Sequence, residues 1–181
     1  MVINDWLIVG EPSSTPFTPG EGSLTTGHLS SATGYSSTAM GFFTRASGSF
    51  STAMGDFTYA SGRNSTAMGS STEASGRNST TMGRGTQAYG IGTTVIGEYN
   101  ESFYASSNDS EFQDNADGHL FVVGNGSSPS DRSNAMVVYH DGAVDVGKND
   151  ADDTVPLKVT SDGSVILAKE QGDISMGAFG N

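Results

Sequence analysis

The chain has no cysteine and few of the large apolar residues that build a thick core. Without cysteine, disulfides and thiolate metal sites are excluded, and the redox compartment stays open. Only 34% of its 181 residues are hydrophobic and 9% are aromatic, while Gly, Ser, Thr and Ala crowd the first half. No run approaches the roughly 20 apolar residues of a membrane-spanning helix. The opening MVINDWLIVG also lacks the basic start and cleavage site of a signal peptide. We therefore expect either a protein outside that secretion route or one whose leader was trimmed.

Positive charge is scarce as well. The net charge is −12, with eight Lys and Arg against twenty Asp and Glu. Residues 98–181 hold fifteen of the acids, so the second half is the acidic half. Nucleic acid and anionic membranes need basic residues to neutralise phosphate, so this composition argues against both as partners.

A strict glycine repeat dominates the first half. From Gly27 to Gly97 a glycine occurs at every seventh residue without an insertion. Two kinds of heptad alternate, one ending in Thr-Ala-Met-Gly and the other in Ala-Ser-Gly, so the true unit has fourteen residues. A glycine in every heptad costs about 1 kcal/mol in a helix, which argues against a coiled coil. Collagen needs glycine at every third residue, which is not the case here.

These exclusions predict an all-β fold built on a parallel β-solenoid with fourteen-residue coils. Each coil holds two short strands joined by two glycine turns, because glycine accepts a positive φ without penalty. The predicted turn glycines are Gly34, Gly41, Gly48, Gly55, Gly62, Gly69, Gly76, Gly83, Gly90 and Gly97.

Residues fourteen apart stack at the strand spacing of about 4.8 Å, so the repeat predicts ladders of like side chains. Strand alternation directs Ser37 and Ala39 inward on one strand, and Thr44 and Ala46 inward on the other. A stripe of Thr and Met then lies on the outer face, and we expect it to be buried against copies of the chain around a symmetry axis. The predicted trimer interface consists of Thr38, Met40, Thr52, Met54, Thr66, Met68, Thr80, Met82, Thr94 and Ile96. The outward residues of the second sheet, Arg45, Tyr59, Glu73 and Gln87, face solvent.

The alternating STAMG and ASG units over residues 27–97 resemble the head repeat of trimeric autotransporter adhesins of the YadA type. The resemblance implies a left-handed parallel β-roll, three copies of which pack on a threefold axis. GHLFVVGNG, RSNAMVVYHDGAVDVGKND and LKVTSDGSVILA resemble trimeric β-rich stalk segments of phage tail fibres and fibre-like bacterial surface proteins.

The other segments predict five regions in all. We expect a docking strand at 1–10 containing Trp6, a Pro/Gly linker at 11–26, the β-roll head at 27–97, an acidic neck at 98–118 and a β-hairpin stalk or tip at 119–181. The apolar start is equally compatible with an ordinary strand and with a segment that docks into a larger assembly. In the last region Asp-Gly pairs at 141–142 and 162–163 lie between short apolar runs, which is a strong hairpin signal.

Candidate chemistry is sparse. Four acids, Asp109, Glu111, Asp114 and Asp117, lack EF-hand spacing, so a solvated loop is preferred over a calcium site. His28, His119 and His140 share no ligand spacing, although each could form a ring of three in a trimer. No nucleophile elbow or catalytic carboxylate pair is present, so we expect no enzymatic activity, cofactor or metal. The threonine ladders raise an ice-binding or purely scaffolding solenoid as a third, minor hypothesis.

The leading functional prediction is a phage virion component, a tail fibre or head-attached fibre used for host attachment. It depends on the missing signal peptide, the docking-like start and the lack of an anchor. The alternative is the head of a bacterial trimeric surface adhesin that binds host or matrix. A host glycan or protein receptor would contact aromatics that vary between coils, namely Phe42, Phe43, Phe57 and Tyr59.

Overall fold

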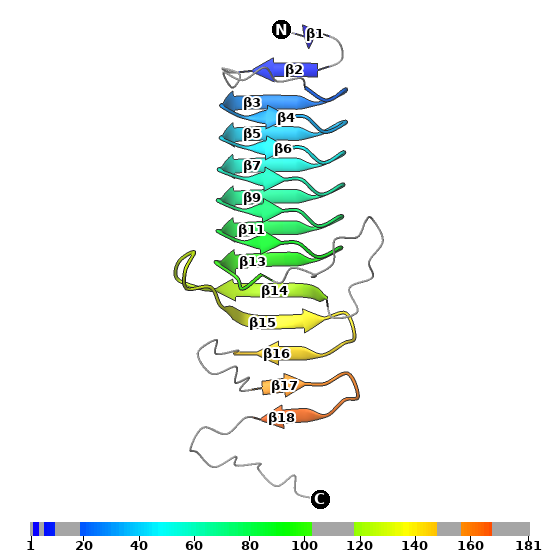
Figure 1. The fold of residues 1–181 in the computed structure, drawn as a ribbon, viewed down its shortest axis with the longest axis vertical. Coiled ribbons are helices and arrows are strands. Elements are labelled where there is room, and N and C mark those ends of the chain that lie inside the picture. The colour runs from blue at the N-terminus through cyan, green and yellow to red at the C-terminus, as the bar shows by residue number, and fades with distance from the viewer. Residues whose placement is uncertain (1, 4–5, 10–18, 103–117, 148–156, 168–181) are drawn as a thin grey trace, which may run out of the picture.

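The computed structural model describes residues 2–3, 6–9, 19–102, 118–147 and 157–167. Within these residues every regular element is a strand. The strands stack one above another into a single elongated body (Figure 1). One sheet has thirteen strands and runs the whole length, and a second sheet of five short strands lies beside its central part. The predicted all-β solenoid is confirmed.

The solenoid alternates a long and a short strand in each coil. The long strands are β3 (Leu24–His28), β5 (Thr38–Phe42), β7 (Thr52–Asp56), β9 (Thr66–Ser70), β11 (Thr80–Arg84) and β13 (Thr94–Glu98). The short strands are β4 (Ser31–Ala32), β6 (Arg45–Ala46), β8 (Tyr59–Ala60), β10 (Glu73–Ala74) and β12 (Gln87–Ala88). Neighbouring strands of each kind are parallel and shifted by fourteen residues, as in the pair Met40 and Met54. The fourteen-residue repeat is therefore the physical coil.

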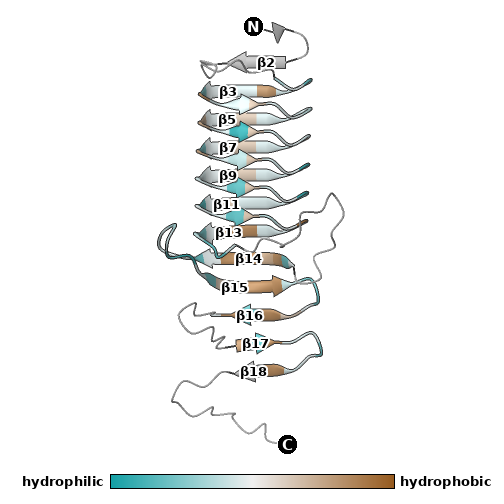
Figure 2. Ribbon diagram, in the orientation of Figure 1, coloured by the Kyte–Doolittle hydropathy of each residue, from teal (hydrophilic) through white to brown (hydrophobic). Residues whose placement is uncertain are grey.

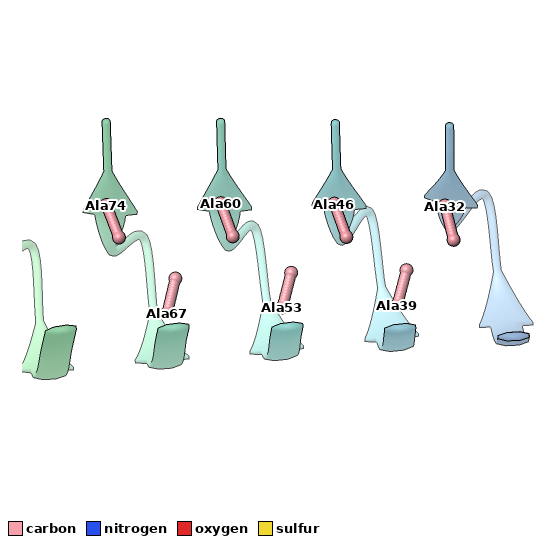
Figure 3. Close-up of a cluster of buried hydrophobic side chains, with 7 residues drawn as sticks. All are labelled: Ala32, Ala39, Ala46, Ala53, Ala60, Ala67 and Ala74. Atoms are coloured by element: carbon pink, nitrogen blue, oxygen red, sulfur yellow. The ribbon is translucent and has the colours of Figure 1, made fainter. Parts of the chain in front are cut away.

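The interior between the two sheets is thin and made of small side chains. Alanines from the long and short strands point toward each other across it (Figure 3). Ser37, Ala39, Thr44 and Ala46, the four residues predicted to point inward, are all at most 1% exposed. Only toward the C-terminal end, beside β12, do larger residues such as Val95, Val122 and Val137 fill the core. The small interior residues let the two sheets lie close together.

The solenoid begins earlier than the glycine repeat does. β3 forms the first long strand of the stack at Leu24, inside the segment predicted as linker. Before it, β1 (Val2–Ile3) and β2 (Trp6–Val9) form an antiparallel pair, and β2 pairs in parallel with β3. The N-terminal segment is thus part of the long sheet. Its docking role stays a prediction.

The C-terminal strands continue this sheet. β14 (His119–Asn125) pairs in parallel with β13, and β15 (Asn134–Tyr139), β16 (Val144–Val146), β17 (Leu157–Val159) and β18 (Val165–Leu167) follow antiparallel. Both Asp-Gly pairs lie at the turns of the predicted hairpins, and Gly142 and Gly163 adopt φ values of 90° and 85°. β13 and β14 are hydrogen-bonded neighbours, and most of the predicted acidic neck, residues 103–117, lies outside the described residues. Hydrophobic residues are denser in β14–β18 than in the coils (Figure 2).

The glycines do not all form turns as predicted. Gly41, Gly55, Gly69, Gly83 and Gly97 lie inside the long strands, one residue before each strand ends. The turns begin after the strand, at residues such as Phe43 and Phe57. The other five, Gly34, Gly48, Gly62, Gly76 and Gly90, do lie at bends between strands.

Close approach between coils explains both classes of glycine. A Cβ at Gly34 would lie 2.0 Å from the carbonyl oxygen of Gly48, and one at Gly41 would lie 2.0 Å from that of Gly55. Any side chain there would push the coils apart.

Candidate interaction surfaces

The outer face of the long sheet presents the predicted interface residues in register. Thr38, Thr52, Thr66, Thr80 and Thr94 stack in one column, and Met40, Met54, Met68, Met82 and Ile96 stack in the next. Most of these side chains are half-buried in the single chain, and Met82 is 39% exposed. The inward neighbour Ala39 is fully buried, so the Thr and Met columns lie on the outer face as expected.

Both columns continue beyond the coils into the C-terminal strands. The Met column passes from Ile96 to Val123, and the Thr column from Thr94 to Phe121. The antiparallel strands then extend the first column through Met136, Val146 and Leu157, and the second through Val138, Val144 and Val159. From β3 to β17 neither column contains a charged residue, although the chain has a net charge of −12. We call these two columns the axial face.

The opposite face is polar. The outward positions of the short strands stack as Arg45, Tyr59, Glu73 and Gln87. Glu73 accepts hydrogen bonds from Ser75 at 2.9 Å and from Tyr89 at 3.0 Å. Tyr59 is 42% exposed, and this is the one predicted receptor residue that lies on a sheet face.

The two edges of the solenoid are formed by tight corners with a left-handed backbone. We call the corner before each long strand the leading corner and the corner after it the trailing corner. Positive φ occurs at Phe50 (60°) and Asn64 (57°) in leading corners and at Phe43 (50°) and Phe57 (51°) in trailing corners. Asn tolerates this conformation, but for a bulky Phe it costs about 1 kcal/mol or more.

Aromatic side chains gather on both edges at the N-terminal coils. On the trailing edge Phe43 stacks on Phe57 at 4.9 Å between ring centroids, and Phe42 contacts Phe43 edge-on at 4.7 Å. On the leading edge Tyr35 contacts Phe50 at 5.5 Å, and the Arg63 guanidinium lies 6.0 Å from the Phe50 ring. Three of the four predicted receptor residues, Phe42, Phe43 and Phe57, thus form one trailing-edge cluster.

Side-chain amides close the end of the short sheet, a feature that the sequence analysis missed. Asn100 accepts a hydrogen bond from the Gln87 N–H at 2.7 Å and donates one to the Gln87 carbonyl at 3.0 Å. Asn134 repeats this on Glu101, accepting at 3.1 Å and donating at 3.3 Å. Both side chains are at most 1% exposed. The amides take the place of the strand that would follow β12.

Beyond the end of the second sheet, the polar side chains of Tyr139, Asp145 and Lys158 contact one another. Asp145 is 4% exposed, accepts the Tyr139 hydroxyl hydrogen bond at 2.8 Å and has the Lys158 ammonium at 3.4 Å. Burial, and then the bond to Asp145, raise the pKa of Tyr139 well above its usual range. The hydrogen bond from the Tyr139 hydroxyl to Asp145 thus links β15 to β16.

No metal centre is formed by the residues that the structure describes, since no three His, Asp or Glu side chains converge there. His28 stacks on Phe42 at 5.6 Å and His119 contacts Tyr139 at 5.2 Å. The acidic cluster Asp109, Glu111, Asp114 and Asp117 lies outside the described residues, as does the side chain of Trp6. Across the described part of the chain there is no helix of the length and apolarity needed to cross a membrane.

Comparison with known protein families identifies the coils. The YadA head domain repeat matches residues 32–58, 60–86 and 74–99. The matches lie within the solenoid, from β4 to β13, and cover less than half of the chain. A search of curated proteins returned no match. The chain therefore contains YadA head domain repeats, and the predicted resemblance is confirmed for the coils. The stalk resemblance of the C-terminal strands stays a prediction.

Proposed function

We propose that the chain forms the adhesive head of a fibrous surface protein, in which three copies join through the axial face. The observation that carries this proposal is the occurrence of YadA head domain repeats in a solenoid whose outward Thr and Met columns contain no charged residue. The head-like character follows from the repeats. The trimer is our inference from the face.

Burial energetics support self-association through this face. Each Met side chain removed from water contributes roughly 1.5–3 kcal/mol. In a single chain Met82, Val146 and Val165 are 39%, 37% and 61% exposed, on consecutive parts of the same sheet. A contiguous apolar stripe of this length favours a protein partner over water. The thin Ser, Thr and Ala interior gives each copy little hydrophobic burial of its own, so the stripe matters more for stability.

A bacterial surface adhesin fits better than a phage fibre. The matched repeat is named for an adhesin head, and this agrees with the alternative drawn from the sequence. The virion hypothesis depended on features of the chain ends. The matched repeats lie in the coils and give that hypothesis no support. We therefore place the protein on the cell surface, as a non-enzymatic adhesin with no cofactor, and propose a host glycan or matrix protein as its receptor.

Oligomeric state is the first test. Multi-angle light scattering of the 18.6 kDa chain should give three times the chain mass. Replacing Met54 and Met68 together by Asp should dissociate or unfold the assembly, because two buried charges per copy would meet at the axis. Arg45→Asp on the opposite sheet serves as control and should leave the mass unchanged. A stable monomer, or equal behaviour of the two variants, would refute this assignment of the face.

Location and adhesion are the second test. Antibody labelling should decorate the surface of producing cells, and the purified trimer should bind immobilised matrix or host cells. Labelling of virions in place of cells would overturn the surface-adhesin proposal in favour of a fibre. Binding by the trimer but not by the Met54→Asp/Met68→Asp variant would link adhesion to assembly.

A further inference from the structure

Exposed aromatics lie on both edges of the solenoid at matching coils. Tyr35 and Phe50 on the leading edge are 49% and 47% exposed, and Phe42 and Phe57 on the trailing edge are 42% and 40% exposed. Tyr35 precedes β5 and Phe42 is its last residue, and Phe50 and Phe57 flank β7. Each coil that carries an exposed ring at one end therefore carries another at the opposite end.

Contacts within the chain cover these aromatic rings only in part. The positions equivalent to Phe57 hold other side chains with positive φ, such as Phe43 and Ser71, but the positions that follow Phe50 in the later coils hold Asn64, Asn78 and Gly92. Those residues accept a left-handed backbone at less cost than Phe does. Phe50 thus strains its backbone and, like Phe57, keeps nearly half of its surface in water despite its ring contacts within the chain, so both rings are available for a contact outside it.

Charges on the two edges are complementary as well. Arg63 is exposed on the leading edge, where its guanidinium lies 6.0 Å from the Phe50 ring. Asp56 is exposed on the trailing edge, and among the described residues neither of the two has an ion-pair partner. Arg84, at the trailing end of β11, already forms an ion pair with Glu98 at 2.7 Å. Arg77, at the leading corner of β11, would therefore face an arginine of the next copy whose charge is already compensated.

We propose that the leading corners of one copy pack against the trailing corners of the next copy, pairing Phe50 with Phe57 and Tyr35 with Phe42. Arg63 precedes β9 and Asp56 ends β7, so the long Arg63 side chain would reach back by one coil, about 4.8 Å, to pair with Asp56. The inference rests on the proposed trimer, in which the axial face points to the symmetry axis. Rotation about an axis parallel to the stack keeps every coil at its height, so the two ends of β5 and β7 meet their counterparts. Aromatic pairs of this kind stabilise an interface beyond their buried area.

The absence of cysteine from the chain permits a clean test. In the full-length protein, Phe50→Cys combined with Phe57→Cys should form disulfides between copies under mild oxidation. Non-reducing electrophoresis should show a covalent trimer. β7 separates the two positions within one chain by roughly 15 Å or more, beyond the roughly 7 Å that a disulfide can span between Cα atoms. Each single cysteine variant should remain uncrosslinked, because identical positions lie at different corners of a ring.

The outcomes separate the corner proposal from the trimer itself. Trimers by light scattering that fail to crosslink would overturn the corner contact and leave the trimer standing, with the rings free for a glycan. Dimers from the single Phe50→Cys variant would indicate a twofold contact and also overturn it. A monomeric parent protein would refute the proposed function directly.

Charge exchange provides a second measurement that does not alter the rings. Arg63→Asp and Asp56→Arg should each lower the thermal midpoint of the assembly, and the two together should restore most of the loss. Circular dichroism checks that each variant folds. Additive losses without restoration would mean that Arg63 and Asp56 do not meet.

Discussion

At the scale of single residues, glycine sets the distance between coils. The carbonyl of each repeat glycine occupies the space that a Cβ would need on the glycine fourteen residues earlier, as with Gly62 and Gly76 at 2.0 Å. Strand spacing is fixed by backbone hydrogen bonds, so the coils cannot move apart to admit a methyl group. The repeat therefore requires glycine for space even where its φ is not positive.

Substitutions at two glycines would separate the effect of close contact between coils from the effect of backbone conformation. Gly62→Ala should cost about 3 kcal/mol or more, because the new methyl group would overlap the backbone of the next coil. Gly92→Ala should cost only about 1 kcal/mol, because φ is +70° but nothing lies within 4 Å of the added carbon. Thermal unfolding at one chain concentration measures both. Equal losses would show that positive φ, and not close approach, is the reason for glycine.

At the scale of elements, side-chain hydrogen bonds replace strand pairing at the end of the short sheet. Backbone groups at the edge of a sheet need partners when they are buried. After β12 the polypeptide provides no further short strand in the described residues, and Asn100 binds both polar groups of Gln87 instead. We call the Asn100 side chain the cap of the short sheet. Asn100 follows Thr86 by fourteen residues, so the cap occupies the inward threonine position of the next coil.

Removal of the cap should destabilise the molecule strongly. Asn100→Leu keeps a similar volume but leaves the N–H and carbonyl of Gln87 buried and unpaired, which should cost about 2–4 kcal/mol. Asn64→Gly is the control, because it removes the exposed hydrogen bond of 3.0 Å that the Asn64 side-chain amide donates to Asn78, while keeping the positive φ. That change should cost under about 1 kcal/mol. Chemical denaturation of both variants compares the two, and a small effect at Asn100 would mean that water replaces the cap.

The sequence predicted the elements wherever a short period determined them. Alternation along a strand and the fourteen-residue repeat were enough to assign Ala39 inward and Met40 outward. They could not reveal that β14 pairs with β13, because that pairing joins Thr94 to Phe121 across an aperiodic segment. The left-handed corners at Phe50 and Phe57 were also missed, since a bulky residue with positive φ contradicts local preference. The Asn100 cap lacked any repeated signal.

At the scale of the whole molecule, the axial face joins two regions that differ in topology. The coils are parallel and the C-terminal strands are antiparallel, yet Met82, Ile96, Val123 and Met136 follow one another on adjacent strands. The Thr column is replaced by Phe and Val along this path, so both columns become apolar just where the second sheet stops. Antiparallel strands without a covering sheet are marginal alone. In the proposed trimer, we therefore expect their outward face to depend on the other copies more than the coils do.

This dependence predicts that the C-terminal strands contribute to assembly as strongly as the head does. Met136→Asp on β15 should reduce or abolish the trimer as severely as a single Met68→Asp on β9, because each places a charge in the same apolar column. Ser61→Asp, exposed on the edge of the short sheet, should leave the trimer intact. Sedimentation over a range of concentrations compares the three variants. If Met136→Asp assembles normally while Met68→Asp does not, the axial face ends at β13 and the C-terminal strands stand apart from the interface.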